Sequence, residues 1–293
     1  MKIRPAVMRF LGCLSVAVLA VCPTLMINVA AQDPRSMMPA ESTAKAREIL
    51  AQAIAALGGP VYLNARDSDC KGTFAQFESS GAVGGYVQTR ILKQFPDKYR
   101  IELDSKTFIT DIYGIPINKK GHHIVNVYAG DQAWTLNSEA GVSELEPQAL
   151  TDYQEQLKGD FNVILRNRLN DDSLIFRYGG SDIVDVKQVD WVEITDRDRR
   201  TVRIAIEKRT HLPTRTTVTT RNPLTGQTQE TARVYSNYRS LDGIMTPLQL
   251  SVFVNERQVS QLFYNSCSNN SGLSPELFTE AGLQAQFKGK KFN

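Results

Sequence analysis

The longest apolar run of the chain lies close to its start. Residues 10–27 are almost wholly apolar, three basic residues precede them, and small residues follow at 29–31. This order of basic, apolar and small residues is typical of a cleaved secretory signal peptide. A retained membrane anchor is the alternative, but a proline and an asparagine near the end of the run argue against it. We therefore expect residues 1–31 to be removed and residues 32–42 to form a flexible leader.

Two later stretches repeat their apolar residues with the period of an α-helix. The first, 43–57, carries one apolar stripe, formed by Ala46, Ile49, Leu50, Ala53, Ile54 and Leu57. Gly58, Gly59 and Pro60 should end it, because glycine favours a left-handed cap and proline cannot continue a helix. The second stretch, 148–169, has a similar spacing, although a glycine weakens its middle. We expect a helix over each range.

Most of the remaining chain alternates apolar and polar residues, which is the period of a β-strand. Residues 98–104 alternate most cleanly, with apolar side chains on one face and charged ones on the other. Turn signals rich in glycine, proline and aspartate separate the runs. The pattern predicts about six strands before the second helix and about seven after it, with runs at 71–77, 85–94, 98–104, 106–113, 123–128, 132–136, 201–207, 214–221, 228–238, 248–255 and 258–264.

These elements predict a single α+β domain over residues 43–293. Ten to thirteen antiparallel strands cannot form a flat sheet, because strand twist makes a sheet of that size curl, split or close. We expect a strongly curved antiparallel sheet, whose concave face is covered by the N-terminal helix and the mid-chain helix. No linker or internal repeat divides the domain.

The alternation also predicts which side chains face the concave side. The apolar set expected there is Tyr99, Ile101, Leu103, Trp134, Val202, Ile204 and Ile206. The charged set expected in solvent is Lys98, Arg100, Glu102, Arg203 and Glu207. Two helices cover less area than a dozen strands present, so part of the concave face should form an apolar cavity with few titratable groups inside. Such a surface usually binds a ligand.

Charge and cysteine content narrow the function classes. Three of the 34 basic residues and none of the 31 acidic ones lie in 1–31, so the expected mature chain holds 31 of each. That balance lacks the basic excess of most nucleic-acid binders. Cys13 and Cys22 also lie in the expected signal peptide, 1–31, which leaves Cys70 and Cys267. In an oxidising compartment these two could form a disulfide or remain two separate buried thiols.

Sequence signatures of catalysis are missing. His122 and His123 are adjacent in a strand and point to opposite faces, so they cannot bind one metal together, and His211 fits a turn. The chain has no Gly-x-Ser-x-Gly elbow, no phosphate-binding glycine loop and no Cys-x-x-Cys. We therefore expect no catalytic residues, no metal and no cofactor, and a protein that is not an enzyme.

A succession of four motifs resembles the LolA/LolB-type periplasmic lipoprotein carriers and the outer-membrane lipoprotein-sorting-like proteins related to them. The motifs are a Pro-x-x-Tyr strand entry at 96–99, a Gly-Asp-x-x-Trp turn at 130–134, Asp-Gly-Ile-x-x-Pro at 242–247, and a helical turn ending in Phe278. The chain departs from the carriers at Phe95, where they have a basic residue, and in a longer body after residue 180. The resemblance implies an incomplete β-barrel with helices at its mouth.

The resemblance also implies a function and a compartment. Proteins of this kind hold lipoprotein acyl chains in an apolar cavity on their way to the outer membrane, without catalysis. We therefore expect a periplasmic binder or carrier of lipoprotein acyl chains or other lipids. The alternative is a periplasmic sensor or scaffold on the same fold, with the exported domain of an envelope membrane protein as its partner.

Overall fold

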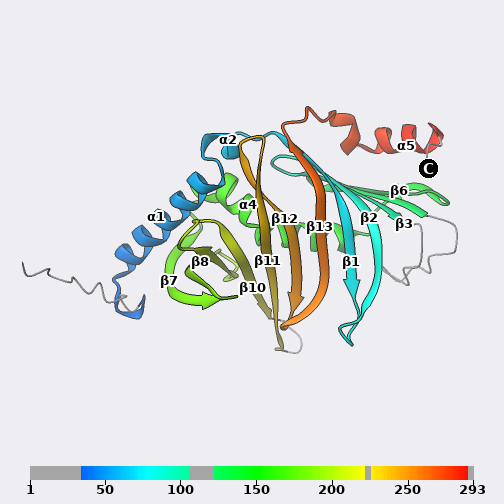
Figure 1. The fold of residues 1–293 in the computed structure, drawn as a ribbon. Coiled ribbons are helices and arrows are strands. Elements are labelled where there is room, and N and C mark those ends of the chain that lie inside the picture. The colour runs from blue at the N-terminus through cyan, green and yellow to red at the C-terminus, as the bar shows by residue number, and fades with distance from the viewer. Residues whose placement is uncertain (1–33, 106–121, 222–225, 290–293) are drawn as a thin grey trace, which may run out of the picture. The chain divides into compact units, whose positions relative to one another are not determined.

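Thirteen antiparallel strands form one sheet in the computed structural model, which describes residues 34–105, 122–221 and 226–289 (Figure 1). The strand order is β6-β5-β4-β3-β2-β1-β13-β12-β11-β10-β9-β8-β7, so the first strand pairs with the last. The sheet curves but does not close, because β6 and β7 stand at its two ends. The first six strands are β1 (Asp67–Phe77), β2 (Val83–Gln94), β3 (Lys98–Ser105), β4 (His122–Ala129), β5 (Gln132–Asn137) and β6 (Gly141–Glu144).

Seven more strands follow the mid-chain helices in the described part of the chain, as many as predicted, although no run had been located for the first two of them. They are β7 (Ile175–Val184), β8 (Lys187–Thr195), β9 (Thr201–Glu207), β10 (Pro213–Arg221), β11 (Thr228–Leu241), β12 (Ile244–Val254) and β13 (Arg257–Asn269). The short strand β6 was not predicted, and the strand expected at 106–113 lies outside the described residues.

The N-terminal helix α1 (Pro39–Leu57) begins four residues before its predicted start and ends where predicted. Most of its apolar stripe is buried against β7 and β8, while Ile54 is only partly buried. Gly58 caps the helix at φ +128°, and a Cβ there would lie 2.5 Å from the Gly243 carbonyl oxygen. The cap therefore requires glycine for both conformation and space. A single turn, α2 (Pro60–Leu63), follows.

The helix predicted at 148–169 is broken into three pieces. These are α3 (Pro147–Lys158), α4 (Phe161–Val163) and the π-helical turn η2 (Ile164–Arg168). The break comes at Gly159, after which the Asp160 carboxylate caps the next turn by accepting a hydrogen bond from the Asn162 backbone N–H at 2.7 Å. The aspartate thus starts a new helix, so the single-helix prediction was wrong. Among the described residues no helix has both the length and the apolar character needed to cross a membrane.

The two faces of the sheet carry different helices. The inner face is the one that carries α1, α3, α4 and η2, and its main core includes Val202, Ile204 and Ile206 packed with Phe161 and Leu50. The opposite face, called the outer face, is covered over strands β3–β6 by a 3₁₀ turn, η3 (Pro275–Phe278), and by the C-terminal helix α5 (Glu280–Gly289). Helix α5 was not predicted.

This second layer corrects two predictions about side-chain direction. Trp134 pairs with Val127, and both pack with Phe278 and Leu283 on the outer face, so the prediction that Trp134 faces inward was wrong. Arg100 lies in the same row and is only 2% exposed, because its guanidinium donates hydrogen bonds to the Leu277 carbonyl and the Gln286 side chain. The outer face is therefore a second interior here and not a solvated surface.

The remaining charged residues of the predicted exposed set also differ from the prediction. Glu207 is buried at the end of β9, where it accepts a hydrogen bond from Thr210 and pairs with Lys187 and Arg209. The other three, Lys98, Glu102 and Arg203, are intermediate in exposure. Of the five, Arg100, Glu102, Arg203 and Glu207 form ion pairs on the sheet, and Lys98 donates a hydrogen bond to the Gln94 side chain.

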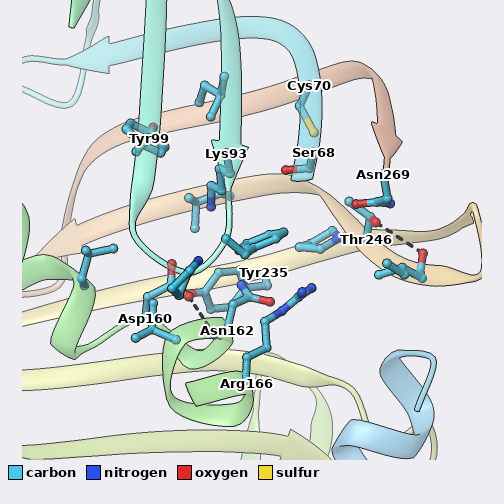
Figure 2. Close-up of a pocket in the computed structure, with 18 of the residues that line it drawn as sticks. Ser68, Cys70, Lys93, Tyr99, Asp160, Asn162, Arg166, Tyr235, Thr246 and Asn269 are labelled. Atoms are coloured by element: carbon cyan, nitrogen blue, oxygen red, sulfur yellow. Dashed lines mark hydrogen bonds between the residues drawn. The ribbon is translucent and has the colours of Figure 1, made fainter. Parts of the chain in front are cut away.

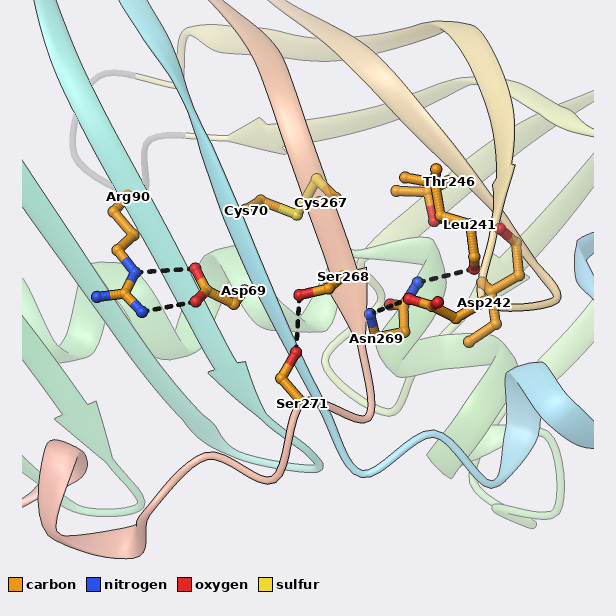
Figure 3. The surroundings of a disulfide bond; sticks show 11 residues. Asp69, Cys70, Arg90, Leu241, Asp242, Thr246, Cys267, Ser268, Asn269 and Ser271 are labelled. Atoms are coloured by element: carbon orange, nitrogen blue, oxygen red, sulfur yellow. Dashed lines mark hydrogen bonds and ion pairs between the residues drawn. A yellow bond between two sulfur atoms is a disulfide. The ribbon is translucent and has the colours of Figure 1, made fainter.

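The two cysteines of the domain join the first strand to the last. Cys70 and Cys267 are direct partners across β1 and β13, with their Cα atoms 4.0 Å apart and a disulfide between their Sγ atoms (Figure 3). Beside it, Arg90 forms a two-bond ion pair with Asp69 at 2.9 and 2.6 Å. Of the two alternatives that the sequence left open, the structure contains the disulfide.

Candidate functional site

A cavity of about 280 Å³ lies between the inner face of the sheet and the helices above it (Figure 2). Strands β1, β2, β3 and β11–β13 form its floor, and residues of α2, α3, α4 and η2 form its roof. Its size is near the lower end of the ~300–1,000 Å³ typical of small-molecule pockets. It lies over the central strands of the sheet, and no residue of α1 lines it.

Apolar and aromatic side chains form most of the cavity wall. The floor contributes Ile91, Leu250 and Leu262, and aromatic rings come from both floor and roof. Tyr153 of α3 stacks on the sheet at ring-centroid distances of 5.6 Å from Tyr99 and 4.1 Å from Tyr128. This stacking fixes α3 above β3 and β4, although no residue of α3 is fully buried.

Five tyrosines are among the neutral polar residues that line the cavity. Burial raises the pKa of Tyr62, Tyr153, Tyr235 and Tyr264 well above the ordinary value of 10.0. Loss of hydration disfavours the charged phenolate, so these side chains stay protonated at neutral pH. They offer hydrogen bonds and cannot serve as bases, as when the Tyr62 hydroxyl donates to the Asn162 side-chain oxygen at 3.0 Å.

Charged residues line the cavity as well, which corrects the prediction of few titratable groups. Four are basic, Lys93, Lys98, Arg166 and Arg233, and one is acidic, Asp160. Within the described part of the chain, none of the four basic side chains forms an ion pair with a carboxylate. The Lys98 ammonium donates a hydrogen bond to the Gln94 side-chain oxygen at 3.1 Å. Lys93, Arg166 and Arg233 are therefore the cations that act on the cavity, against the single carboxylate of Asp160.

Arg166 is the most enclosed of these cations. Its guanidinium carbon lies 4.0 Å from the ring centroid of Tyr62 and 4.2 Å from that of Phe95, so the group is sandwiched between two rings. Its Nε and Nη1 atoms are buried, and no described residue accepts a hydrogen bond from either. Buried charged donors are normally hydrogen-bonded, so these two nitrogens are an unusual feature.

The predicted site residues are divided among four places. Tyr99 lines the cavity, whereas Ile101 and Leu103 lie further along the same face, in a small cluster with Val87. Val202, Ile204 and Ile206 are on the inner face but are buried in the core that α1 covers. With Trp134 on the outer face, Tyr99 alone of the predicted set lines the cavity, and a binding role for it stays a prediction.

Sequence reasoning placed the mid-chain helix over the concave face but missed the basic residue that it brings to the cavity. Arg166 falls in a stretch that reads as an ordinary amphipathic helix, in which a basic residue would be expected to face solvent. The π-helical turn changes the angle between successive side chains, so that Arg166 lies over the sheet instead. The aspartate after Gly159 was the available sign that the helix restarts there.

The arrangement can hold a ligand, and its groups do not form a recognisable catalytic or metal centre. No cluster of three or more His, Cys, Asp or Glu side chains that could bind a metal occurs in the ranges that the structure describes. The cavity combines an apolar floor, protonated tyrosine hydroxyls and basic side chains that form no ion pair with a described residue.

Comparison with known proteins places the fold. No protein-family model matches the chain, and no curated protein matches its sequence. Among solved structures, a DUF1329 family protein from Desulfovibrio piger matches with a TM-score of 0.53 at 16% identity, over 82% of this chain and 99% of that one. An outer membrane lipoprotein-sorting protein domain from Vibrio parahaemolyticus matches with a TM-score of 0.53 at 12% identity, over 83% and 99%.

A LolA superfamily protein from Nitrosomonas europaea also aligns, with a TM-score of 0.48 at 16% identity, over 80% of this chain and 97% of that one. Identities this low describe a shared fold and not a shared activity. The resemblance inferred from the motifs is therefore confirmed for the fold, and the incomplete barrel that it implied is the architecture observed.

Proposed function

We propose that the protein is a non-enzymatic periplasmic binder or carrier of acyl chains, either of lipoproteins or of other lipids, exported by a signal peptide at 1–31. The observation that carries the proposal is the cavity itself. Ile91, Leu250 and Leu262 give it an apolar floor, and tyrosines from both the strands and the helices complete its wall. A fold shared with a lipoprotein-sorting domain supports the same reading.

The physical driving force is sufficient without any chemistry. Burying one methylene group contributes about 0.8 kcal/mol, so ten methylenes supply ~8 kcal/mol before the entropy costs of binding. Aromatic side chains in the cavity wall give wide contact surfaces for an alkyl chain. There are six of them: Tyr62, Phe95, Tyr99, Tyr153, Tyr235 and Tyr264. A cavity of about 280 Å³ favours one chain over several.

A test of this proposal fills the cavity. Ile91→Trp places a large side chain on the cavity floor, whereas Gln88→Trp makes the same addition at an exposed position on the outer face of the same strand. Titration with a fluorescent fatty-acid probe should show saturable uptake by the wild type and by Gln88→Trp, and strongly weakened uptake by Ile91→Trp. Circular dichroism establishes that both variants are folded.

Two results would count against the proposal. One is a wild-type protein that takes up no probe, and the other is equal uptake by both folded tryptophan variants. In the first case the alternative function becomes the better one, a scaffold that binds the exported domain of an envelope membrane protein. A pull-down from envelope extracts with the same two variants would then test that role.

A further inference from the structure

The cavity is both apolar and basic, and this combination defines a class of ligand. Resting on the proposed function, we infer that the ligand is an anionic amphiphile: an acyl chain whose carboxylate or phosphate head group binds at Arg166. The chain lies over the floor residues Ile91, Leu250 and Leu262, and the neighbouring cations Lys93 and Arg233 add to the positive potential at the head group.

The basic residues that line the cavity stand beside an apolar wall and have no counter-ion among the described residues. Elsewhere on the sheet, Arg90 pairs with Asp69 at 2.6 Å, Arg100 with Glu102 at 2.7 Å, and Arg203 with Glu193 at 3.1 Å. Other strand cations without an ion pair in the described ranges, such as Lys71 and Arg177, are exposed to water, whereas those of the cavity stand against its apolar floor, and no described carboxylate forms an ion pair with them. Unpaired cations beside a low-dielectric wall attract an anion strongly, since screening by water is reduced there.

Arg166 is the residue best placed to hold the head group. The rings of Tyr62 and Phe95 hold its guanidinium at 4.0 and 4.2 Å and limit its rotation. A planar guanidinium donates two parallel hydrogen bonds to a carboxylate or a phosphate, a geometry that lysine lacks. Nε and Nη1 are buried and have no acceptor among the described residues, so an anionic head group that displaces the side chains around them would supply the acceptors they lack.

The acidic residue of the cavity does not neutralise this site. One oxygen of the Asp160 carboxylate accepts the hydrogen bond from the Asn162 backbone N–H that caps α4. No ion pair joins Asp160 to Arg166 or to the other lining cations within the described ranges. The Asp160 carboxylate keeps its negative charge while it caps the helix, so it offsets one of the positive charges without forming an ion pair. The cavity keeps an excess of positive charge.

The test compares two probes that share one acyl chain, a fatty acid and the uncharged monoacylglycerol of the same chain length, each titrated by calorimetry. Arg166→Gln removes the charge and keeps a polar, though shorter, side chain. Arg47→Gln is the matched control, because Arg47 also stacks on an aromatic ring, Phe176 at 4.4 Å, but lies on the exposed side of α1 outside the cavity.

The inference predicts that wild type and Arg47→Gln bind the fatty acid more tightly than the monoacylglycerol. Arg166→Gln should bind the fatty acid about 10- to 100-fold more weakly, the loss expected for charge-assisted hydrogen bonds, with its affinity for the monoacylglycerol unchanged. Equal wild-type affinity for the two probes, or an equal loss of both in Arg166→Gln, would overturn it. Failure of both probes to bind the wild type would instead refute the proposed function.

Inorganic phosphate distinguishes a lipid head group from a free anion. Phosphate alone should bind the wild type far more weakly than the fatty acid, because it lacks a chain to bury in the cavity. Phosphate that binds as tightly as the fatty acid, and that depends on Arg166, would show a site for a free anion and overturn the assignment of an amphiphile.

Discussion

The disulfide between Cys70 and Cys267 should provide a large part of the stability of the domain. The perturbation is the double variant Cys70→Ala, Cys267→Ala, studied in the secreted form of the chain beside the oxidised wild type. The bond links the first strand to the last, across a sequence separation of 197 residues. Without it, the two halves of the sheet are held at this seam by the β1–β13 hydrogen bonds and side-chain contacts alone.

The size of the effect follows from the length of the loop. In the chain-entropy model a cross-link that closes a loop of this length removes about 5 kcal/mol of disorder from the unfolded state, and measured effects run from about 2 to 5 kcal/mol. A domain is typically stable by 5–15 kcal/mol, so the loss is a substantial fraction of the total. We expect the free energy of unfolding to fall by about 3–5 kcal/mol.

Urea unfolding followed by circular dichroism and by tryptophan fluorescence measures this difference. Reduction of the wild type should lower its unfolding midpoint to near that of the double variant, whereas the reductant should not affect the variant, which has no bond to break. A thiol titration of the unfolded, unreduced wild type should detect no free thiol. If the free energies of unfolding of the double variant and the oxidised wild type differ by less than about 1 kcal/mol, the disulfide does not stabilise the domain by restricting the unfolded chain, and this prediction is wrong.

Three further predictions concern the outer face and the ion pair beside the disulfide. Arg100→Ala should lower the free energy of unfolding by about 3 kcal/mol, because it leaves buried partners under α5 unpaired. Arg90→Ala removes a half-exposed pair and should lower it by about 1 kcal/mol or less. Urea unfolding of the two variants compares these losses. Trp134→Ala should cost about 3–5 kcal/mol and, by hydrogen exchange, expose the backbone of α5; unchanged protection of α5 would contradict its packing on Trp134. The hydrogen bond from Arg90 lowers the pKa of Asp69, so the ionised carboxylate stabilises the fold. This stabilisation is complete above the unfolded pKa of about 4 and is lost as the pH falls through the folded pKa. Asp69→Asn should therefore flatten the acid limb of a curve of unfolding free energy against pH, and an unaltered limb would contradict the role given to Asp69.

Much of the fold was predictable from the sequence because strand periodicity survives wherever one face of the sheet is wet or lightly covered. The alternation at 98–104 located β3 because charged side chains occupy its outer face, even though Arg100 among them is buried. Proline and glycine turns located most of the hairpins. The prediction failed where both faces are buried. Over β3–β5 the outer face meets η3 and α5, so Trp134 and Val127 are apolar for an outer layer that the alternation cannot reveal.

Helix α5 escaped prediction for a related reason. Its ten residues contain two glycines and two glutamines, and few apolar positions define a stripe. Leu283 is fully buried beneath the helix, but one such residue gives no periodic signal. The sequence also could not identify the cavity's charge, because Arg166 reaches the cavity through a π-helical turn and the other cations come from separate strands. Their convergence is a property of the tertiary structure.

The most direct test of acyl-chain binding is native mass spectrometry of the protein purified, without detergent, from the periplasm of its own cells. If the cavity binds an anionic acyl chain, part of the wild-type protein should carry one added mass, which dissociates as an anionic species with an acyl chain. The Ile91→Trp variant should lack this mass, and the Gln88→Trp variant should retain it. A wild-type protein that is entirely free of ligand, and that remains so after incubation with fatty acid, would contradict the central claim.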